Sequence, residues 1–430
     1  MTKTIELITG TVDKSYMHSI EDYKSHRGFN GLNNAVKMDK EDIIQEIIDA
    51  KLLGRGGAGF PTGIKWRHLY SVEGEPKYIV CNADEGEPGT FKDRLFMKKD
   101  PLIVIEGMLI AAYVFGSKEG YIYIRGEYRG LFEGFELALK NAKEAGYLGE
   151  NILGIEGFDF DINIISGAGA YVCGENSTLL NSIEGQAGRP RVKPPRLAEV
   201  GLFGKPTLVN NVETFANIPI ILDRGAEYYR SVGTEESGGS LIVCTSGHAK
   251  NRHYFEVPVG TNLKDIIYDE ELAGGTSTRK PVKFVHIGGQ SGPLAFPEQF
   301  DISFDHISLR NAGLSIGTGA IVIVDESVCL VDYLKKVFEF FIDESCGKCN
   351  PCREGNQQMY ILLDKFSKGE GTEKDIETMK NLAEAMMQAS FCGLGQAAPT
   401  ALMSALRHRE SEFLAHVDKE CSKCFKKEVM

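Results

Sequence analysis

Three closely spaced cysteines carry the clearest chemistry in this sequence. Cys346, Cys349 and Cys352 form a C-x2-C-x2-C pattern, and Cys392 follows in a Ser-Phe-Cys-Gly-Leu-Gly segment. Three close thiols with one distant partner are typical of a [4Fe–4S] cluster, in which the run binds three corners and the distant residue binds the fourth. Zinc sites usually combine two C-x2-C pairs instead, and buried free cysteines fit this spacing poorly. We therefore expect these four thiols to bind an iron–sulfur cluster.

A second group of possible metal ligands lies near the end of the sequence. His416, Cys421 and Cys424 form an H-x4-C-x2-C pattern. They could provide three ligands of a zinc site if a fourth comes from elsewhere in the chain. The alternative is a disordered tail in which these residues bind nothing, and the pattern alone leaves both open.

Two glycine-rich segments are suited to bind a phosphate. Residues 54–66 include Lys65, and their glycines allow backbone N–H groups to approach an anion closely. This segment lacks the Gly-Lys-Ser/Thr of a Walker A loop, and it follows a helical pattern rather than the strand that a Rossmann fingerprint requires. Residues 166–176 form a second glycine segment, which follows an expected strand and opens a helix.

Polar loops contribute further candidate residues. A carboxylate-rich loop follows the expected strand 77–81, at the kind of strand end where α/β proteins bind ligands; a solvated loop is the alternative. The basic segment 186–206 is either solvated or closes over an anionic cofactor. Amide side chains within residues 207–214 offer donors and acceptors to a flavin or nucleotide.

The composition limits the class of protein. With 430 residues, 42% of them hydrophobic, the chain can form two to four domains. A net charge of −12 disfavours general binding of nucleic acid. Ten cysteines without a signal peptide indicate a reducing compartment, so we expect a cytoplasmic protein. The apolar run 102–115 is too short to insert into a membrane and contains Glu106.

The hydrophobic pattern predicts the elements that position these residues. Alternating helices and strands up to about residue 229 indicate an α/β layer. Short strands between residues 240 and 326, with one helix near 262–268, indicate a small α+β module of β-grasp type. The remainder reads as helical apart from the cysteine loops and predicts a cluster-bearing helical bundle.

In combination, these motifs resemble one family, the flavoprotein subunit of complex I-type NADH dehydrogenases. Its relatives in soluble NAD(P)-dependent hydrogenases and formate dehydrogenases are similar too. The motifs are the two glycine segments, Asn-Ala-Asp-Glu-Gly-Glu-Pro-Gly-Thr, Val-Asn-Asn-Val-Glu-Thr and Ser-Cys-Gly-Lys-Cys-x-Pro-Cys-Arg-Glu-Gly, and the likeness covers about residues 35–415. The resemblance implies an N-terminal extension (1–35), a Rossmann-like FMN and NAD(P)H domain (36–235), a ubiquitin-like β-grasp domain (236–328), a [4Fe–4S] helical bundle (329–415) and a tail (416–430).

The resemblance also implies which residues bind the cofactors. The implied FMN contacts are Gly54, Gly56, Lys65, Asn82, Asp84, Glu85, Tyr171, Gly174, Glu175, Asn210, Asn211 and Thr214. The implied nicotinamide nucleotide contacts are Gly57, Phe60, Lys65 and Glu87.

Three departures from the family pattern concern the nucleotide. Asn176 stands where a second glutamate is usual, Arg196 where an aromatic residue stacks on the adenine, and His68 where another aromatic contact is common. A carboxylate near the ribose 2′-OH selects NAD, whereas an arginine accommodates the 2′-phosphate of NADP. Arginine can also stack on the adenine. We therefore expect these three residues to contact the nucleotide and NADP(H) to be preferred over NAD(H).

The implied activity is that of a diaphorase subunit. FMN accepts a hydride from NAD(P)H and releases single electrons to the cluster. Because the sequence contains no terminal catalytic module, we expect partners: a [2Fe–2S] thioredoxin-like subunit and an iron–sulfur catalytic subunit such as an [FeFe]-hydrogenase or a formate dehydrogenase. Such a complex could be electron-bifurcating. The alternatives are a respiratory complex I subunit and, from another class, a non-enzymatic iron–sulfur or zinc docking scaffold.

Overall fold

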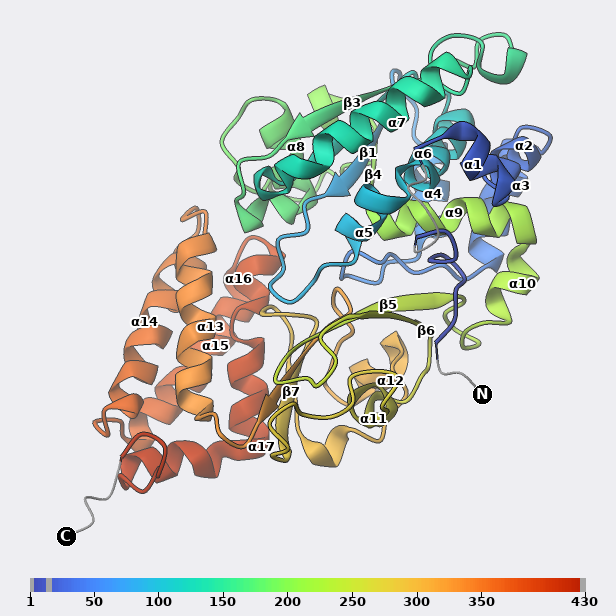
Figure 1. Cartoon of the computed structure of the whole chain (residues 1–430). Helices are drawn as coiled ribbons and strands as arrows, with labels where there is room; N and C mark the ends of the chain where they lie inside the picture. The colour runs from blue at the N-terminus through green and yellow to red at the C-terminus, as the bar shows by residue number, and fades with distance from the viewer. Residues whose placement is uncertain (1–3, 13–17, 426–430) are drawn as a thin grey trace. The chain divides into compact units, whose positions relative to one another are not determined.

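The computed structural model describes residues 4–12 and 18–425. Figure 1 shows the chain coloured by residue number. The described residues divide into two compact units. The first unit runs from the first described residues to Gly86 and adds Phe91–Val243 and Tyr254–Thr261. The second comprises Glu87–Thr90, Cys244–His253 and the described residues from Asn262 onward. This division is coarser than the five segments expected from the sequence.

A four-stranded parallel sheet lies at the centre of the first unit. Its order is β3-β2-β1-β4, so the chain adds strands first on one side of β1 and then on the other. Such a reversal leaves a crevice at the carboxyl ends of β1 and β4, where doubly wound folds bind their ligands. The predicted Rossmann-like α/β layer is thereby confirmed. The strands are β1 (Tyr78–Ala83), β2 (Glu119–Ile124), β3 (Asp161–Ser166) and β4 (Thr207–Asn211).

Helices cover both faces of this sheet. Alternate residues of β1 face opposite ways, so Ile79 and Cys81 join one hydrophobic cluster and Val80 joins another with residues of α8. Helix α6 packs against α9 and is buried on nearly every side. The helices are α3 (Lys40–Asp49), α4 (Thr62–Ser71), α5 (Asp93–Lys99), α6 (Pro101–Phe115), α7 (Phe132–Glu144), α8 (Asn176–Ile183), α9 (Val212–Arg224) and α10 (Ala226–Arg230). The sequence predicted one helix from about residue 214 to 229; Gly225, with φ of 88°, divides it.

The N-terminal residues are part of the first unit's core. They include α1 (Ile20–Ser25) and α2 (Asn30–Ala35), and Phe29 is fully buried. The carboxylate of Glu106 in α6 accepts hydrogen bonds from the Tyr23 hydroxyl at 2.5 Å, from Phe29 N at 2.8 Å and from Leu32 N at 2.9 Å. The hydrophobic pattern of this segment is weak, so the sequence did not predict that the segment is packed. The segment makes its contacts with residues far along the chain.

The second unit begins with a mixed sheet. The end of β5 (Ser240–Gly247) is parallel to β9 (Ala320–Asp325), which is antiparallel to β7 (Val282–Ile287); β7 pairs with β8 (Leu294–Ala295). The short helices α11 (Leu263–Tyr268) and α12 (His306–Asn311) lie between these strands in the sequence, and β6 (Tyr254–Pro258) belongs to the first unit. The predicted short strands are present, while the β-grasp topology stays a prediction.

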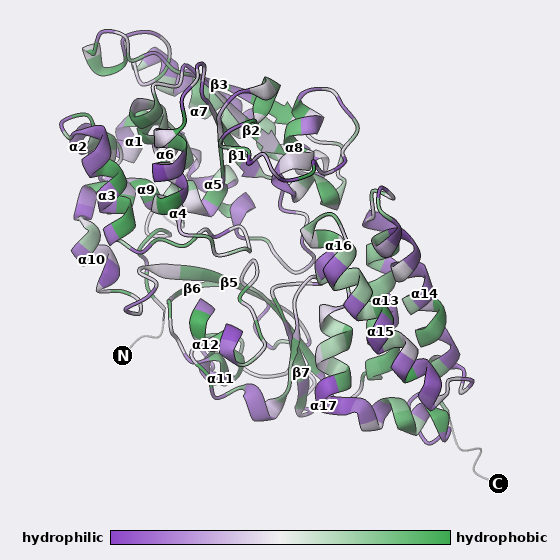
Figure 2. Cartoon of the chain, turned by 180° about the vertical axis from the view of Figure 1, so that it is seen from behind, coloured by the Kyte–Doolittle hydropathy of each residue, from purple (hydrophilic) through white to green (hydrophobic). Residues whose placement is uncertain are grey.

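A helical region closes the described chain, as predicted. Helix α13 packs against α14, and α14 against α15. In α13 the buried residues Leu334, Val337, Phe338 and Phe341 recur at helical spacing, and Figure 2 shows polar and apolar residues mixed along these helices. Among the described residues, no helix combines the length and apolar character needed to cross a membrane. The helices are α13 (Leu330–Glu344), α14 (Asn350–Ser367), α15 (Glu373–Ala389), α16 (Gly393–Ala397) and α17 (Thr400–Val417).

Candidate functional site

The ends of β1 and β4 gather residues from both glycine segments. At the end of β1, the side-chain amide of Asn82 donates to the Gly174 carbonyl at 2.8 Å and to Asn176 Oδ1 at 3.1 Å. Asn82 Oδ1 accepts from the backbone of Asp84 at 3.1 Å. A Cβ placed on Gly86 would lie 3.1 Å from the ring of Tyr171. The acidic loop and the second glycine segment, which are far apart in sequence, therefore meet at the predicted strand end.

The first glycine segment lies against the start of α9. Arg55 N donates to Thr214 Oγ1 at 2.9 Å, and Gly54 N donates to the Phe60 carbonyl at 2.9 Å. A Cβ on Gly56 would come within 3.0 Å of Asn211 Cβ, so this approach leaves little room for a larger residue. Both glycine segments thus converge on the carboxyl ends of β1 and β4.

Lys65 is a partly buried cation without a carboxylate partner among the described residues. Its Nζ, on α4, donates to the Val209 carbonyl at 3.0 Å and to Asn210 Oδ1 at 3.3 Å. Burial lowers the pKa of Lys65 to about 8. Asn210 Nδ2 is buried and has no hydrogen-bond partner in the described part of the chain. An anion beside Lys65 would relieve the cost of the buried charge, so these groups fit a flavin phosphate.

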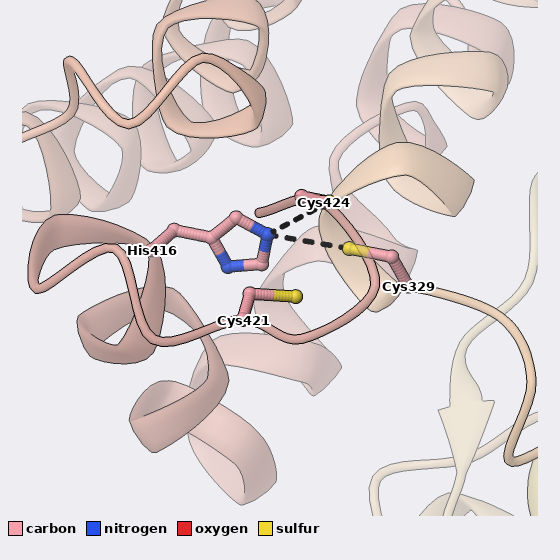
Figure 3. A group of neighbouring side chains, drawn as sticks. All are labelled: Cys329, His416, Cys421 and Cys424. Atoms are coloured by element: carbon pink, nitrogen blue, oxygen red, sulfur yellow. Dashed lines mark hydrogen bonds between the residues drawn. The ribbon is translucent and has the colours of Figure 1, made fainter. Parts of the chain in front are cut away.

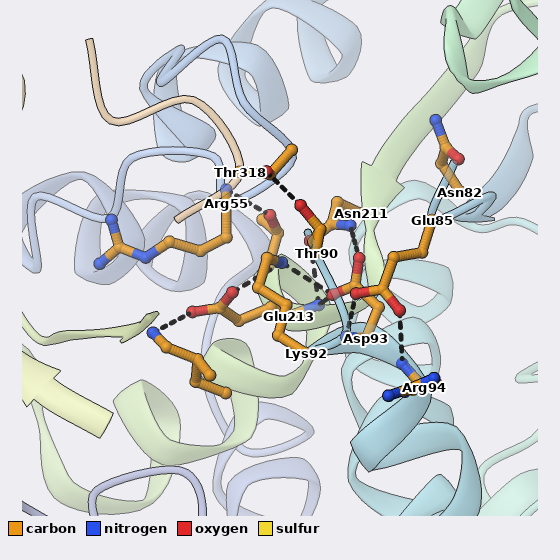
Figure 4. A network of polar contacts seen from close by, with 12 residues as sticks. Arg55, Asn82, Glu85, Thr90, Lys92, Asp93, Arg94, Asn211, Glu213 and Thr318 are labelled. Atoms are coloured by element: carbon orange, nitrogen blue, oxygen red, sulfur yellow. Dashed lines mark hydrogen bonds and ion pairs between the residues drawn. The ribbon is translucent and has the colours of Figure 1, made fainter. Parts of the chain in front are cut away.

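A buried charge network holds the neighbouring residues (Figure 4). Lys92 Nζ pairs with Asp93 Oδ1 at 2.8 Å and with Glu213 Oε2 at 2.7 Å, and Asn211 Nδ2 donates to Asp93 Oδ2 at 2.6 Å. Glu85 accepts from the Asp93 backbone at 2.7 Å. Burial, followed by the charge of Asp93, raises the pKa of Glu85 to about 7. The carboxylate of Glu85 therefore anchors the start of α5, and no local pattern in the sequence signals that Lys92 and Asp93 are buried.

Glu175 caps the N-terminus of α8. It accepts from Thr178 N at 2.9 Å and from the Ser177 hydroxyl, and Lys193 Nζ lies 3.2 Å from Oε1. Burial alone would raise the pKa of Glu175, but the hydroxyl of Ser177 and the charge of Lys193 lower it below its usual value. The basic segment 186–206 thus reaches the second glycine segment through Lys193, whose role the sequence did not predict.

The residues expected to contact the nucleotide lie in several places. Phe60 is 51% exposed, and Arg196 is exposed as well. Glu199, which no sequence motif indicated, contacts two of the residues expected to bind the nucleotide, His68 and Arg196. Its Oε1 lies 3.5 Å from His68 Nε2, and its Oε2 accepts from Arg196 N at 3.0 Å. Gly57 adopts a positive φ of 119°.

Glu87 is part of the second unit. Its carboxylate accepts from the Ser291 hydroxyl at 2.8 Å and from Ser291 N at 3.3 Å.

The four cysteines expected to bind a cluster are close together in the second unit. Cys349 precedes α14, Cys352 lies in its first turn and Cys392 precedes α16. A Cβ on Gly395 of α16 would lie 2.8 Å from Cys352 Cβ. Burial raises the pKa of the Cys352 thiol to about 11, and nearby Cys349, Cys392 and Cys346 raise it as well. The N-terminus of α14, an 18-residue helix, favours the negative charge of a thiolate cluster.

Another group of possible metal ligands forms at the end of α17 (Figure 3). His416, Cys421 and Cys424, already noted in the sequence, are joined by Cys329. Residues up to Phe425 are described, and His416 is buried inside α17, so the ligand-bearing part of the expected tail is ordered. Cys329 escaped the sequence analysis because it lies 87 positions before His416 and belongs to no spaced pattern.

Comparisons with known proteins match both regions. The family described as the Nuo51 FMN-binding domain matches residues 47–220, and that described as the NADH-ubiquinone oxidoreductase-F iron-sulfur binding region matches residues 332–416. The F 2 subunit of the NADH-quinone oxidoreductase of Rhizobium meliloti (strain 1021) is 42% identical over 95% of this chain and 96% of that protein. The NADP-reducing hydrogenase subunit HndC of Solidesulfovibrio fructosivorans is 43% identical over 94% of this chain and 82% of that protein.

A solved structure of a related enzyme is also similar to this chain. The structure of a NAD+-reducing [NiFe]-hydrogenase in the H2-reduced state aligns with a TM-score of 0.82 and 33% identity, covering 95% of this chain and 66% of that chain. The chain therefore belongs to the NADH-quinone oxidoreductase-F family, as the sequence motifs predicted, and is an FMN-dependent oxidoreductase with a [4Fe–4S] cluster region.

Proposed function

We propose that this chain is the diaphorase subunit of a soluble hydrogenase or formate dehydrogenase complex, and that it favours NADP(H). It would exchange hydride between the nucleotide and FMN and pass single electrons to partner subunits. The observation that carries the proposal is the partly buried Lys65 at the crevice between β1 and β4, whose only described hydrogen-bond acceptors are neutral. When bound, FMN supplies the conversion of a two-electron hydride into single electrons.

The residues of the first unit would hold the flavin. The ammonium of Lys65 and the N–H groups of both glycine segments provide positive charge for its phosphate. The free Nδ2 of Asn210 provides a further donor. The network around Asp93 fixes Asn211, so the polar wall of the crevice is already in position before a ligand arrives. In the second unit, Cys346, Cys349, Cys352 and Cys392 would bind the cluster.

The preference for NADP(H) rests on the charges around positions 176 and 196. Asn176 is neutral and accepts from Asn82, and the exposed Arg196 offers a cation for a 2′-phosphate. Lys193, paired with Glu175, adds positive charge to the same segment, whereas Glu199 adds an anion beside His68. A relative that is 43% identical is named as an NADP-reducing hydrogenase subunit.

Steady-state kinetics of the purified complex with both nucleotides tests this preference. We expect a higher kcat/KM with NADPH than with NADH, and a reversal of the order in Asn176→Glu combined with Arg196→Ala. A wild-type preference for NADH would refute the proposal.

We propose partner subunits because the electrons that leave the cluster of this chain need an acceptor. A [2Fe–2S] thioredoxin-like subunit would accept electrons from this chain, and an iron–sulfur catalytic subunit would follow. Affinity purification with identification of the co-purifying subunits tests this arrangement, and hydrogen- or formate-dependent reduction of NADP+ with and without ferredoxin tests bifurcation. Membrane-arm subunits in the purified complex would favour a role in respiratory complex I, which the names of several relatives support.

Absorption spectra separate these enzymes from a docking scaffold. We expect flavin bands that bleach when NADPH is added under anaerobic conditions. A purified complex in which this chain never retains FMN would support the scaffold.

A further inference from the structure

We propose that Cys329, His416, Cys421 and Cys424 bind one zinc ion, which fastens the end of the helical region to its beginning. The ligand atoms of all four residues lie within 4.8 Å of one another (Figure 3). Zn–S bonds of about 2.3 Å and Zn–N bonds of about 2.0 Å, arranged as a tetrahedron, require ligand atoms about 3.5–3.8 Å apart. His416 Nε2 already lies 3.3 Å from Cys329 Sγ and 3.4 Å from Cys424 Sγ. A three-cysteine, one-histidine set is a standard ligand set of structural zinc.

The histidine is oriented for this role. His416 Nδ1 lies 2.8 Å from the Glu412 carbonyl, an acceptor, so Nδ1 carries the proton and the lone pair of Nε2 faces the sulfurs. Metal-bound histidines characteristically donate their second ring N–H in this way, which fixes the tautomer and the direction of the ring. His416 is 1% exposed, so its imidazole is shielded from water.

Charged side chains of both signs surround the four ligands. Three thiolates with one zinc ion carry a net negative charge, and the carboxylate of Asp332, 3.5 Å from Cys424 Sγ, adds to it. Two cations lie next to Cys329: Lys283 Nζ donates to the Val328 carbonyl at 3.0 Å, and Lys423 Nζ donates to the same oxygen at 3.3 Å. Each also lies near a carboxylate, Lys283 at 2.6 Å from Glu412 and Lys423 at 3.9 Å from Glu326. The thiolates thus lie among charged groups of both signs.

The close spacing distinguishes this site from an iron–sulfur cluster. Thiolates that bind different iron atoms of a cluster lie farther apart than ligands of a single ion. The four ligand atoms here converge on one point, and one of them is an imidazole nitrogen. The site therefore matches one tetrahedral ion and is separate from the thiols at positions 346, 349, 352 and 392.

The positions of the ligands indicate what the ion does. Cys329 is the N-cap of α13, whereas His416 lies in the last turn of α17 and Cys421 and Cys424 lie in the turn after it. The ion would close a loop of chain that contains all of α13–α17. The four cluster cysteines lie inside this loop, so the zinc site would restrain the helices that carry them.

Metal analysis of the full-length protein in its complex, purified anaerobically without a polyhistidine tag, tests the proposal. We expect one zinc per copy of this chain, and its loss in Cys421→Ser and in His416→Ala. Ser422→Ala, an exposed change within the same turn, is the matched control and should retain zinc. The thermal midpoint of the zinc-depleted variants should fall relative to this control, while FMN remains bound.

A second measurement on the wild-type protein avoids the risk that a variant fails to fold. Growth with cobalt in place of zinc should give the intense thiolate-to-Co(II) absorption and the visible bands of a tetrahedral ion, both absent from Cys421→Ser. Wild-type protein without zinc and with freely titratable thiols at these positions would overturn the proposal. Additional iron that is lost in Cys421→Ser would overturn it equally, since the site would then hold an iron centre.

Discussion

The substitution Lys65→Met separates the cost of a buried cation from its use in binding FMN. Burial lowers the pKa of Lys65 from 10.5 to about 8. One pKa unit corresponds to about 1.4 kcal/mol, so the buried charge costs the flavin-free protein roughly 3 kcal/mol at neutral pH. The Val209 carbonyl and Asn210 Oδ1 would lose their donor, at about 1 kcal/mol each. The flavin-free variant should therefore be more stable than the wild type by about 1 kcal/mol.

The same substitution should weaken FMN binding. A hydrogen bond to a charged group contributes about 1.5–3 kcal/mol, so the affinity for FMN should fall about 10- to 150-fold. Urea denaturation of the deflavinated protein measures the first effect, and fluorescence titration with FMN measures the second.

The pH dependence of the free energy of unfolding independently tests whether the charge of Lys65 destabilises the flavin-free protein. Because the folded pKa of Lys65 lies below its unfolded value, the unfolded chain binds more protons between about pH 8 and 10.5. The stability of the wild type relative to Lys65→Met should therefore rise across this interval. Lys77→Met is the matched control. Burial also lowers the pKa of Lys77, which immediately precedes β1 and donates to the Leu69 carbonyl in α4, so this change should leave FMN affinity unaltered. Unchanged FMN affinity in Lys65→Met would refute the assignment of Lys65 to the phosphate.

Three further substitutions have distinct expected outcomes. Gly56→Val adds atoms where a Cβ already meets Asn211 Cβ at 3.0 Å, so FMN content after purification should fall while Gly130→Val, in open space, should retain it. Cys392→Ser should lower the iron of the [4Fe–4S] cluster and abolish electron transfer to partner subunits; retention of all four iron atoms would contradict its role as a ligand. Glu106→Leu leaves three buried donors without an acceptor and should lower the free energy of unfolding by roughly 3 kcal/mol or more, measured by urea denaturation.

The sequence predicted those parts of the molecule that depend on local pattern. Strands such as β1 alternate between two apolar clusters, and α13 repeats apolar residues at helical spacing, so both were predictable. The cluster cysteines were found because three of them are neighbours in the chain. Cys329 and Glu199 were missed because each acquires its partners only through folding, and nothing in the adjacent residues signals them.

The N-terminal segment shows the same limit. Its buried members, such as Phe29, satisfy no clear helical or strand period, and their partners are groups like the Glu106 carboxylate. In the sequence, Glu106 stands out only as a charge that argues against a membrane segment. A single acid in an otherwise apolar helix was in fact the acceptor to which the first helices attach.

The carboxylate of Glu256 has a consequence for the order in which this protein can be made. It accepts from the backbone of Leu7 at 3.1 Å, of Ile8 at 3.0 Å and of Thr9 at 2.9 Å. These three residues leave the ribosome 249 to 247 positions before the acceptor that they bind. During translation their backbone N–H groups lack their native acceptor until Tyr254–Thr261 emerges. A fragment that stops at residue 235 would lack this acceptor, so we expect it to be less stable than the complete first unit.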